Sequence, residues 1–291
     1  MDTVIGPEEA TLKRWFGRAK LYLGYYEARA RRHEPEFRAS LRPTDTFLVG
    51  HPKSGNTWVA YMLALLIQPD RSSDINLLNV GDFVPFVHGR DRDIANYAPL
   101  PDPRVFRNEY PLHARAYPRI LYLVRDPRAV LVSFWHMYRV LFDDRTTGIG
   151  SFVEQYMYGS GCFRYWNKHL IRWDHQVRRN SRRAARSGNV LVVRYEDLVL
   201  DREDELRRIV SFLDLDADDR RLSEVAERGS FDAMRRVEER HGAEAYEGRA
   251  RGEGRFIRKG RIDGWRDEMD EAIAGQVAST FASAMRLVGY E

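Results

Sequence analysis

The chain has 291 residues, 43% hydrophobic and 31% charged, and 47 basic against 43 acidic residues give a formal net charge of +4. This length allows one large α/β domain or two small ones, and either could bury a core. So slight a positive charge favours an anionic ligand and excludes a nucleic-acid-binding arm. The single cysteine, Cys162, excludes an internal disulfide and a zinc site built on several thiolates.

Two features bear on the compartment. Residues 1–10 lack the apolar core of a signal peptide. The longest apolar run, residues 58–67, is about half of the ~20 residues that a membrane-spanning helix needs. We therefore expect a cytoplasmic protein without stable membrane insertion, and the sequence leaves its oligomeric state open.

The first predicted elements form a strand, a loop and a helix. Residues 46–50, Thr-Phe-Leu-Val-Gly, predict a buried strand that ends in glycine. A loop at 51–56 follows, and the apolar stretch 57–67 predicts a helix. Residues 77–103 combine prolines and aromatics without periodicity, which indicates a substrate-side loop or a set of short helices.

Two further strands follow along the chain. Residues 119–124 predict a strand, and Asp126-Pro127 then supply an N-cap and a first-turn proline for a helix that runs through about Tyr138. Residues 190–194 predict a third strand, followed by Tyr-Glu-Asp-Leu and a charged helix near 203–213.

The C-terminal part contains a glycine-rich segment at 241–254, expected to be a mobile loop, and a predicted packing helix at 272–288. Strands that alternate with helices indicate an α/β fold with a central parallel sheet covered by helices on both faces. We expect residues 1–291 to form a single domain. Ligands of such sheets bind at the carboxyl ends of the strands, where the three loops would meet.

The loop after the first strand is typical of phosphate binding. Gly50, Gly55 and Thr57 match the P-loop template Gly-x-x-x-x-Gly-Lys-Ser/Thr, and the start of the helix offers free N–H groups to an anion. Asn56 replaces the template's lysine, and Lys53 lies inside the loop instead. This change disfavours ordinary Mg-ATP chemistry. Lys53 is one of only five lysines against 42 arginines, which indicates a need for a compact point charge.

The segment Pro-Lys-Ser-Gly-Asn-Thr-Trp at 52–58 resembles the 5′-phosphosulfate-binding loop of the soluble sulfotransferases. Those enzymes transfer a sulfo group from 3′-phosphoadenosine 5′-phosphosulfate (PAPS) to a hydroxyl or amine and release 3′-phosphoadenosine 5′-phosphate (PAP). Asn56 stands where many members have threonine, and either side chain can donate a hydrogen bond to a phosphate oxygen. The resemblance implies a PAPS site formed in part by Lys53, Ser54, Gly55, Asn56, Thr57 and Trp58.

A second anion site is indicated at the end of the strand at 119–124. Arg125 would leave the strand tip and Ser133 would lie in the second turn of the next helix, so that both can reach one phosphate. This spacing resembles the family's 3′-phosphate site. The resemblance also implies that Ser133 holds the Lys53 ammonium away until the acceptor binds.

A third segment, residues 255–260, places basic side chains around a glycine. This pattern indicates either a basic patch that binds an anion or a solvated turn. It resembles the family's Arg-Lys-Gly segment, which closes over the 3′-phosphate through Arg258, Lys259 and Gly260. Tyr195 and Phe231 match a tyrosine and a phenylalanine that contact the adenine. The chain departs from the family at Gly229, where threonine is frequent, and at 263–264, where Asp-Gly replaces Gly-Asp.

The expected chemistry is an in-line displacement at sulfur, with Lys53 stabilising the leaving phosphate oxygen and no metal required. The family's usual base is a histidine, but Glu109 occupies that position here. A carboxylate can act as base if burial raises its pKa, against which the nearby Arg107 would act. His113 is the competing base, and a site without a protein base stays open. Arg107 is a secondary candidate for charge stabilisation.

The predicted function is therefore sulfo transfer from PAPS to a hydroxyl of a small molecule, with no nucleic-acid partner. Two alternatives stay open at this point. One is a P-loop small-molecule kinase, which would require Mg²⁺ and ATP. The other is a catalytically silent protein that binds an adenine nucleotide.

Overall fold

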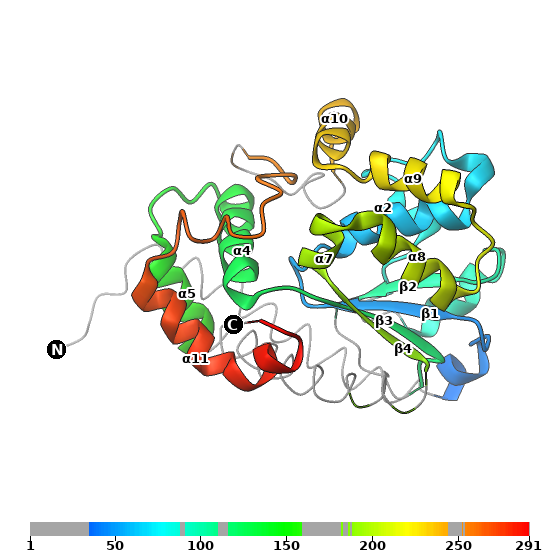
Figure 1. The fold of residues 1–291 in the computed structure, drawn as a ribbon, viewed down its shortest axis with the longest axis horizontal. Helices are drawn as coiled ribbons and strands as arrows, with labels where there is room; N and C mark the ends of the chain where they lie inside the picture. The colour runs from blue at the N-terminus through cyan, green and yellow to red at the C-terminus, as the bar shows by residue number, and fades with distance from the viewer. Residues whose placement is uncertain are drawn as a thin grey trace.

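The computed structural model describes residues 35–87, 91–109, 116–158, 182, 186, 188–243, 252 and 254–290. Its centre is a four-stranded parallel sheet with the order β2-β1-β3-β4 (Figure 1). The strands are β1 (Thr46–Gly50), β2 (Val105–Asn108), β3 (Arg119–Val124) and β4 (Val190–Arg194).

The register brings the carboxyl ends of all four strands to one edge of the sheet. Val49 of β1 lies opposite Asn108 of β2, Gly50 lies opposite Leu123 of β3, and Val124 lies opposite Arg194 of β4. The residues that immediately follow the strands are consequently neighbours in space, although they are far apart in the sequence.

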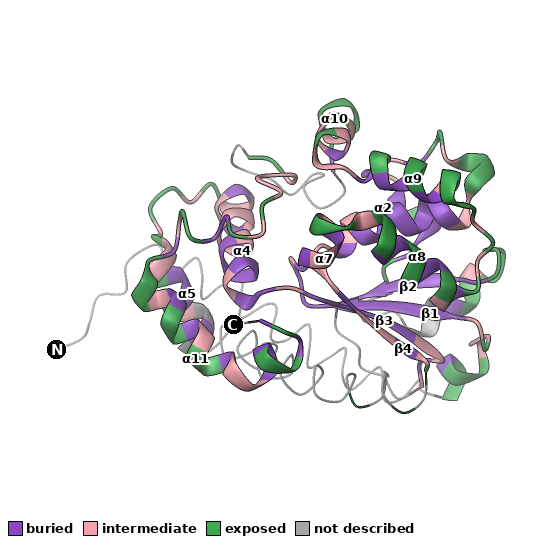
Figure 2. Ribbon diagram, in the orientation of Figure 1, coloured by how far each residue is buried: buried purple, intermediate pink, exposed green. Residues whose placement is uncertain are grey.

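Alternate strand residues enter two separate cores because successive side chains of a strand point to opposite faces. On one face, Leu48, Leu121 and Leu123 pack with α2 (Asn56–Ile67), α8 (Arg202–Leu213) and α9 (Asp219–Arg228). On the other face, the strands pack with two helices that lie between β3 and β4 in the sequence and with the last helix of the chain. These helices are α4 (Pro127–Phe142), α5 (Ile149–Tyr158) and α11 (Glu271–Leu287). Figure 2 shows strands β1 and β2 buried, the edge strand β4 partly buried, and the outer faces of the helices exposed.

Helix α4 begins where the sequence predicts. Asp126 caps it by accepting a hydrogen bond of 2.8 Å from the backbone N–H of Arg128, and Pro127 occupies the first turn. The helix ends at Phe142, beyond the predicted end near Tyr138, and Asp143 terminates it in the left-handed conformation at φ 52°.

The other predicted elements agree closely with the structure. The three predicted strands match β1, β3 and β4 to the residue, which confirms the parallel α/β class with helices on both faces. The predicted helices at 57–67, 203–213 and 272–288 correspond to α2, α8 and α11, each beginning one residue earlier than expected. That residues 1–291 form one domain stays a prediction.

Strand β2 is absent from the sequence-based prediction. It has four residues, Val-Phe-Arg-Asn, and its last two are polar, so no apolar run marks it. All four are buried, since Arg107 and Asn108 find hydrogen-bond partners inside the fold.

Of the two structures expected for residues 77–103, a loop or a set of short helices, the described part contains short helices. They are α3 (Val80–Phe83) and the 3₁₀ helix η2 (Asp91–Tyr97). A further 3₁₀ turn, η1, spans Pro69–Arg71. Helices α7 (Tyr195–Leu200) and α10 (Phe231–His241) complete the described elements. The expected mobile loop falls largely outside the described residues. Within the described part of the chain, no helix combines the length and apolar character needed to cross a membrane.

Candidate active site

The turn between β1 and α2 forms a cradle for an anion. Gly55 precedes the helix with φ 103°, a conformation that glycine adopts without strain, and no side chain caps the N–H groups of the first turn. A Cβ on Gly55 would lie 2.9 Å from the Tyr195 ring, so only glycine lets these segments approach so closely. Because α2 also directs the positive end of its dipole here, the turn is suited to a phosphate.

Lys53 lies at the centre of the turn, half-buried and in a left-handed conformation at φ 72°. Its Nζ lies 4.9 Å from the centre of the Phe256 ring. Burial lowers the pKa of the Lys53 ammonium to about 8, a shift that Glu109 opposes and that Arg125 and Arg258 increase. An anion bound here would relieve that repulsion between cations.

Arg125 follows β3 and connects two of the predicted segments. Its Nη1 donates a hydrogen bond of 2.9 Å to the Lys53 carbonyl, and its guanidinium lies 4.0 Å from the centre of the Tyr195 ring. Tyr195 packs edge-on against Trp58, and the Trp58 indole donates to the Gly229 carbonyl at 2.8 Å. The predicted phosphate-binding Arg125, the predicted adenine-contacting Tyr195 and Trp58 of the anion-binding loop therefore meet at one edge of the sheet.

Glu196 holds the turn that carries Arg125, a role that sequence reasoning missed. One of its carboxylate oxygens accepts a hydrogen bond of 3.1 Å from the backbone N–H of Asp126, and the other accepts from the hydroxyl of Tyr290. Burial raises the pKa of Glu196, while these hydrogen bonds and the charge of Arg125 act in the opposite direction. The Tyr-Glu-Asp-Leu motif marks the position, but nothing local signals a partner 94 residues away.

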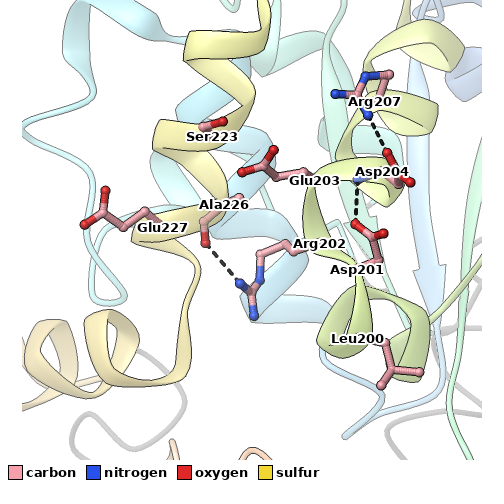
Figure 3. A pocket seen from close by; sticks show the side chains of 9 residues that line it. All are labelled: Leu200, Asp201, Arg202, Glu203, Asp204, Arg207, Ser223, Ala226 and Glu227. Atoms are coloured by element: carbon pink, nitrogen blue, oxygen red, sulfur yellow. Dashed lines mark hydrogen bonds and ion pairs between the residues drawn. The ribbon is translucent and has the colours of Figure 1, made fainter.

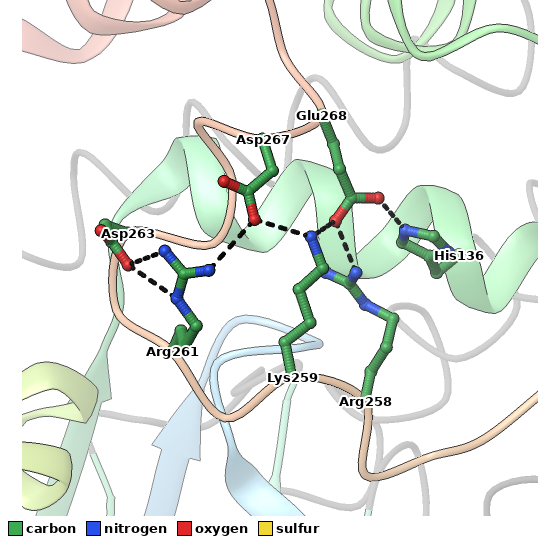
Figure 4. Close-up of polar contacts among 7 residues, drawn as sticks. All are labelled: His136, Arg258, Lys259, Arg261, Asp263, Asp267 and Glu268. Atoms are coloured by element: carbon green, nitrogen blue, oxygen red, sulfur yellow. Dashed lines mark hydrogen bonds and ion pairs between the residues drawn. The ribbon is translucent and has the colours of Figure 1, made fainter.

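The basic segment at 258–259 is held by two carboxylates (Figure 4). The Glu268 carboxylate contacts Arg258 at 2.5 Å, Lys259 at 2.9 Å and also His136, while Asp267 accepts from Lys259 at 3.0 Å. Burial acts to raise the pKa of Glu268, but these donors outweigh it and lower the pKa to about 2. His136 of α4 is therefore part of a polar cluster.

Gly260 and Phe231 pack directly against each other. Gly260 has φ 64°, and a Cβ there would lie 2.3 Å from the Phe231 ring. Ser133 is half-buried on α4, one turn before His136 and on the same helix face. His136 on that face contacts Glu268, which also holds Arg258.

Glu109, the first residue after β2, is joined to the anion-binding turn. Its Oε1 accepts a hydrogen bond of 3.0 Å from Asn56 Nδ2. Burial raises the pKa of the Glu109 carboxyl above its usual value, and the opposing effects of Asn56, Lys53 and Arg107 do not cancel it. Arg107 itself is buried and donates to the Val84 carbonyl at 2.9 Å. A partly buried carboxylate with a raised pKa has the properties of a general base.

Four predicted site residues, one after each strand, thus lie together: Lys53, Glu109, Arg125 and Tyr195. The charge of Arg258 also acts on Lys53. Ser133 lies on α4 and Phe231 begins α10. The competing base His113 lies outside the described residues. A surface groove of about 420 Å³ between α8 and α9 contains none of the predicted site residues (Figure 3). Its Arg202 side chain nevertheless packs over Trp58 at 5.5 Å.

Buried polar atoms test whether the site fits an anionic cofactor. The Ser54 hydroxyl and Arg125 Nε are both buried and have no hydrogen-bond partner among the described residues. Buried donors of this kind normally have a partner, and phosphate or sulfate oxygens would supply one. The Ser54 hydroxyl and the Lys53 ammonium fit a phosphosulfate, and Arg125 Nε fits a second phosphate of the same cofactor. Within the described ranges, no group of three or more His, Cys, Asp or Glu side chains is arranged to hold a metal ion.

Comparison with known proteins places the site in context. The family model "Sulfotransferase domain" matches residues 43–289. The chain is 26% identical over 242 residues to an amine sulfotransferase of Oryctolagus cuniculus, covering 79% of this chain and 76% of that protein. It is 28% identical over 261 residues to cytosolic sulfotransferase 12 of Arabidopsis thaliana, covering 84% and 78%.

Two solved structures share the fold. One is a retinol dehydratase in complex with androsterone and the inactive cofactor PAP, with a TM-score of 0.64 and 21% identity over 84% of this chain and 82% of that one. The other is a mouse sulfotransferase complexed with PAP, with a TM-score of 0.57 and 23% identity over 84% of this chain and 85% of that one.

Proposed function

Since the chain belongs to the sulfotransferase domain family and is a sulfotransferase, we propose that it transfers a sulfo group from PAPS to a hydroxyl of a small molecule. The observation that carries the proposal is the convergence of the three expected segments. Arg125 donates to the Lys53 carbonyl, and the charges of Arg125, Arg258 and Glu109 all act on the Lys53 ammonium. A cationic site with one adjacent carboxylate suits an anionic donor and a neutral acceptor that loses a proton.

The proposed donor site uses residues from each segment. PAPS supplies an activated sulfo group when it is bound. The turn with Lys53 and Ser54 would hold the 5′-phosphosulfate, while the 3′-phosphate would lie on Arg125, Ser133 and the Arg258 segment. The remaining members of the predicted site would contact the phosphates or the adenine ring: Gly55, Asn56, Thr57, Trp58, Tyr195, Phe231, Lys259 and Gly260.

The proposed chemistry divides between a cation and a base. The Lys53 ammonium stabilises negative charge on the leaving phosphate oxygen, and Ser133 restrains that ammonium before the acceptor arrives. Glu109 accepts the proton of the acceptor hydroxyl, and Arg107 stabilises charge near the transferred group. The fixed cations take the place that a metal ion has in phosphoryl transfer, so we expect transfer without added metal.

The acceptor is proposed to carry an apolar part. Phe86 forms a backbone bridge with Arg107 of β2; the residue is 37% exposed and its ring centre lies 5.7 Å from the Arg107 guanidinium. Arg107 lies two residues before Glu109, so an exposed aromatic side chain pairs with the strand that leads to the proposed base.

Transfer of ³⁵S from labelled PAPS to a panel of phenols and alcohols, with EDTA present, tests the proposal. We expect labelled product in the presence of the chelator. Tight PAP binding without any transfer would instead favour a silent nucleotide-binding protein, and Mg²⁺-dependent transfer of phosphate from ATP would favour a kinase.

The pH dependence of kcat/KM is expected to be bell-shaped. Glu109 must be deprotonated to act as base, so activity falls as the pH drops through its raised pKa. Lys53 must be protonated, so activity also falls as the pH rises through about 8. Because kcat/KM reports the free enzyme, steady-state kinetics between pH 5 and 10 measure both limbs. A basic limb that Lys53→Arg leaves in place would contradict the assignment to Lys53.

Arg125→Ala is expected to act on binding of the donor. Removing a charge-assisted contact to phosphate should weaken PAP binding roughly 10–100-fold, while kcat at saturating PAPS changes little. Calorimetry with PAP and steady-state kinetics give the two quantities. Arg207→Ala serves as the matched control, since Arg207 is an exposed side chain paired with Asp204 and Asp219. Equal PAP affinity in the two variants would remove Arg125 from the proposed site.

A further inference from the structure

We propose that Asn56 is a positioning residue that orients the Glu109 carboxylate and thereby couples the anion-binding turn to the proton acceptor. This inference rests on the proposed role of Glu109 as base. It gives the Asn56 side chain a different task from donating to a phosphate oxygen, which is the role that the sequence indicates for it.

The contacts of the Asn56 side chain support this role. Asn56 is the first residue of α2 and is 5% exposed. Its Nδ2 lies 3.0 Å from Glu109 Oε1, 3.1 Å from the His51 carbonyl oxygen and 3.4 Å from the Gly50 carbonyl oxygen. All three neighbours are acceptors, and only the NH₂ end of an amide can face them. The orientation of the amide is therefore fixed by its surroundings.

The space around the Asn56 amide is also restricted. A Cβ on Gly50 would lie 2.3 Å from Asn56 Oδ1, so the glycine that ends β1 makes room for this side chain. Asn56 Oδ1 is buried and has no hydrogen-bond partner among the described residues. The side chain is consequently buried between the end of β1 and Glu109, the residue that follows β2, and its Nδ2 contacts acceptors on both sides.

The residue type matters because the amide has two protons to donate. One can bond to the turn carbonyls while the other bonds to the Glu109 carboxylate. A threonine hydroxyl has a single proton and can serve only one of these acceptors at a time. Asparagine at 56 thus suits a site whose base is a carboxylate, since it can hold the turn and the base together.

The bond to Asn56 favours the charged form of Glu109. Burial raises the pKa of Glu109, and Asn56 opposes this effect together with Lys53 and Arg107, the charged groups that act on it. His51 contributes its carbonyl oxygen to the surroundings of the amide. Burial lowers the pKa of the His51 imidazole to about 4, so the ring is neutral near neutral pH. Removing the amide should therefore make Glu109 harder to deprotonate.

The test measures the titration of Glu109 in the free protein and in turnover. In Asn56→Ala, we expect the ¹³C titration midpoint of the Glu109 side-chain carboxyl, assigned by comparison with Glu109→Gln, to rise by about one pH unit. The acid limb of kcat/KM should move upward by a similar amount. PAP calorimetry on the same variant checks that the turn still binds the cofactor product.

Two further variants sharpen the result. Asn189→Ala removes an asparagine that donates to Pro118 at the opposite end of the sheet, and it should move neither midpoint. Asn56→Thr introduces the threonine that many family members have at this position, so this variant is expected to fold. It therefore replaces the alanine variant if that variant does not fold. It should shift both midpoints in the same direction.

Unchanged midpoints in Asn56→Ala or Asn56→Thr would overturn the proposal. Failure of the proposed function is a different result, because the wild-type protein would then transfer no sulfo group. The NMR titration of Glu109 does not depend on that activity.

Discussion

Glu109→Gln is expected to lower turnover roughly 10²–10⁴-fold while leaving PAP affinity nearly intact. The amide keeps the size of the side chain but cannot accept the acceptor proton. The carboxylate lies beside the turn that would hold the donor, linked to it by Asn56 at 3.0 Å, and burial raises its pKa toward the range useful for a base. Steady-state ³⁵S transfer measures the loss, and calorimetry with PAP measures the binding.

A matched charge removal controls for the change in net charge. Glu203→Gln alters an exposed residue on α8 and should leave turnover unchanged. The competing base is tested in parallel with His113→Gln. If Glu109→Gln keeps full turnover while His113→Gln loses it, the base assignment is wrong. Loss in neither variant would indicate that no protein base acts.

Lys53→Ala is expected to reduce turnover roughly 10²–10³-fold, the range seen when a charge-stabilising donor is removed from an active site. It should also weaken PAP binding, because the ammonium lies in the turn that would hold the 5′-phosphate. This combined effect distinguishes Lys53 from Arg125, whose loss should act mainly on binding. Single-turnover ³⁵S transfer at saturating PAPS isolates the chemical step.

Two other substitutions at position 53 separate charge from backbone strain. Lys53→Arg keeps the charge but replaces a compact ammonium with a planar fork, so it should restore affinity for PAP better than turnover. Lys53→Gly should be about 1 kcal/mol more stable than Lys53→Ala, since φ 72° costs alanine strain that glycine avoids. Equal turnover in Lys53→Ala and the wild type would remove Lys53 from the mechanism.

Local signals in the sequence account for most of the predicted fold. Strand β1 is a short apolar run that ends in Gly50, and Asp126 with Pro127 defines the start of α4 through a cap and a fixed φ. Such features depend on neighbouring residues, so they can be recognised without knowledge of the fold. Strand β2 lacks this signal because half of its residues are polar. Their burial depends on hydrogen-bond partners that are distant in the sequence or become apparent only in the fold.

Three of the site contacts that sequence reasoning missed are long-range. Glu196 meets Tyr290 from 94 residues away, and His136 meets Glu268 from 132 residues away. Asn56 and Glu109, 53 residues apart, become neighbours because β1 and β2 pair in parallel and end at the same edge. The motifs predict which residues bind the cofactor. The pairing of the strands decides which other side chains hold those residues in place.

The central claim is that three separate segments of this chain bind one nucleotide, and a crystal structure with PAP tests it most directly. We expect the 5′-phosphate on the turn at Lys53 and Ser54, and the 3′-phosphate on Arg125 with Arg258 and Lys259. In that structure the two basic side chains would exchange contacts with Glu268 for contacts with phosphate. PAP bound elsewhere, or bound without Lys53 and Arg125, would contradict the account.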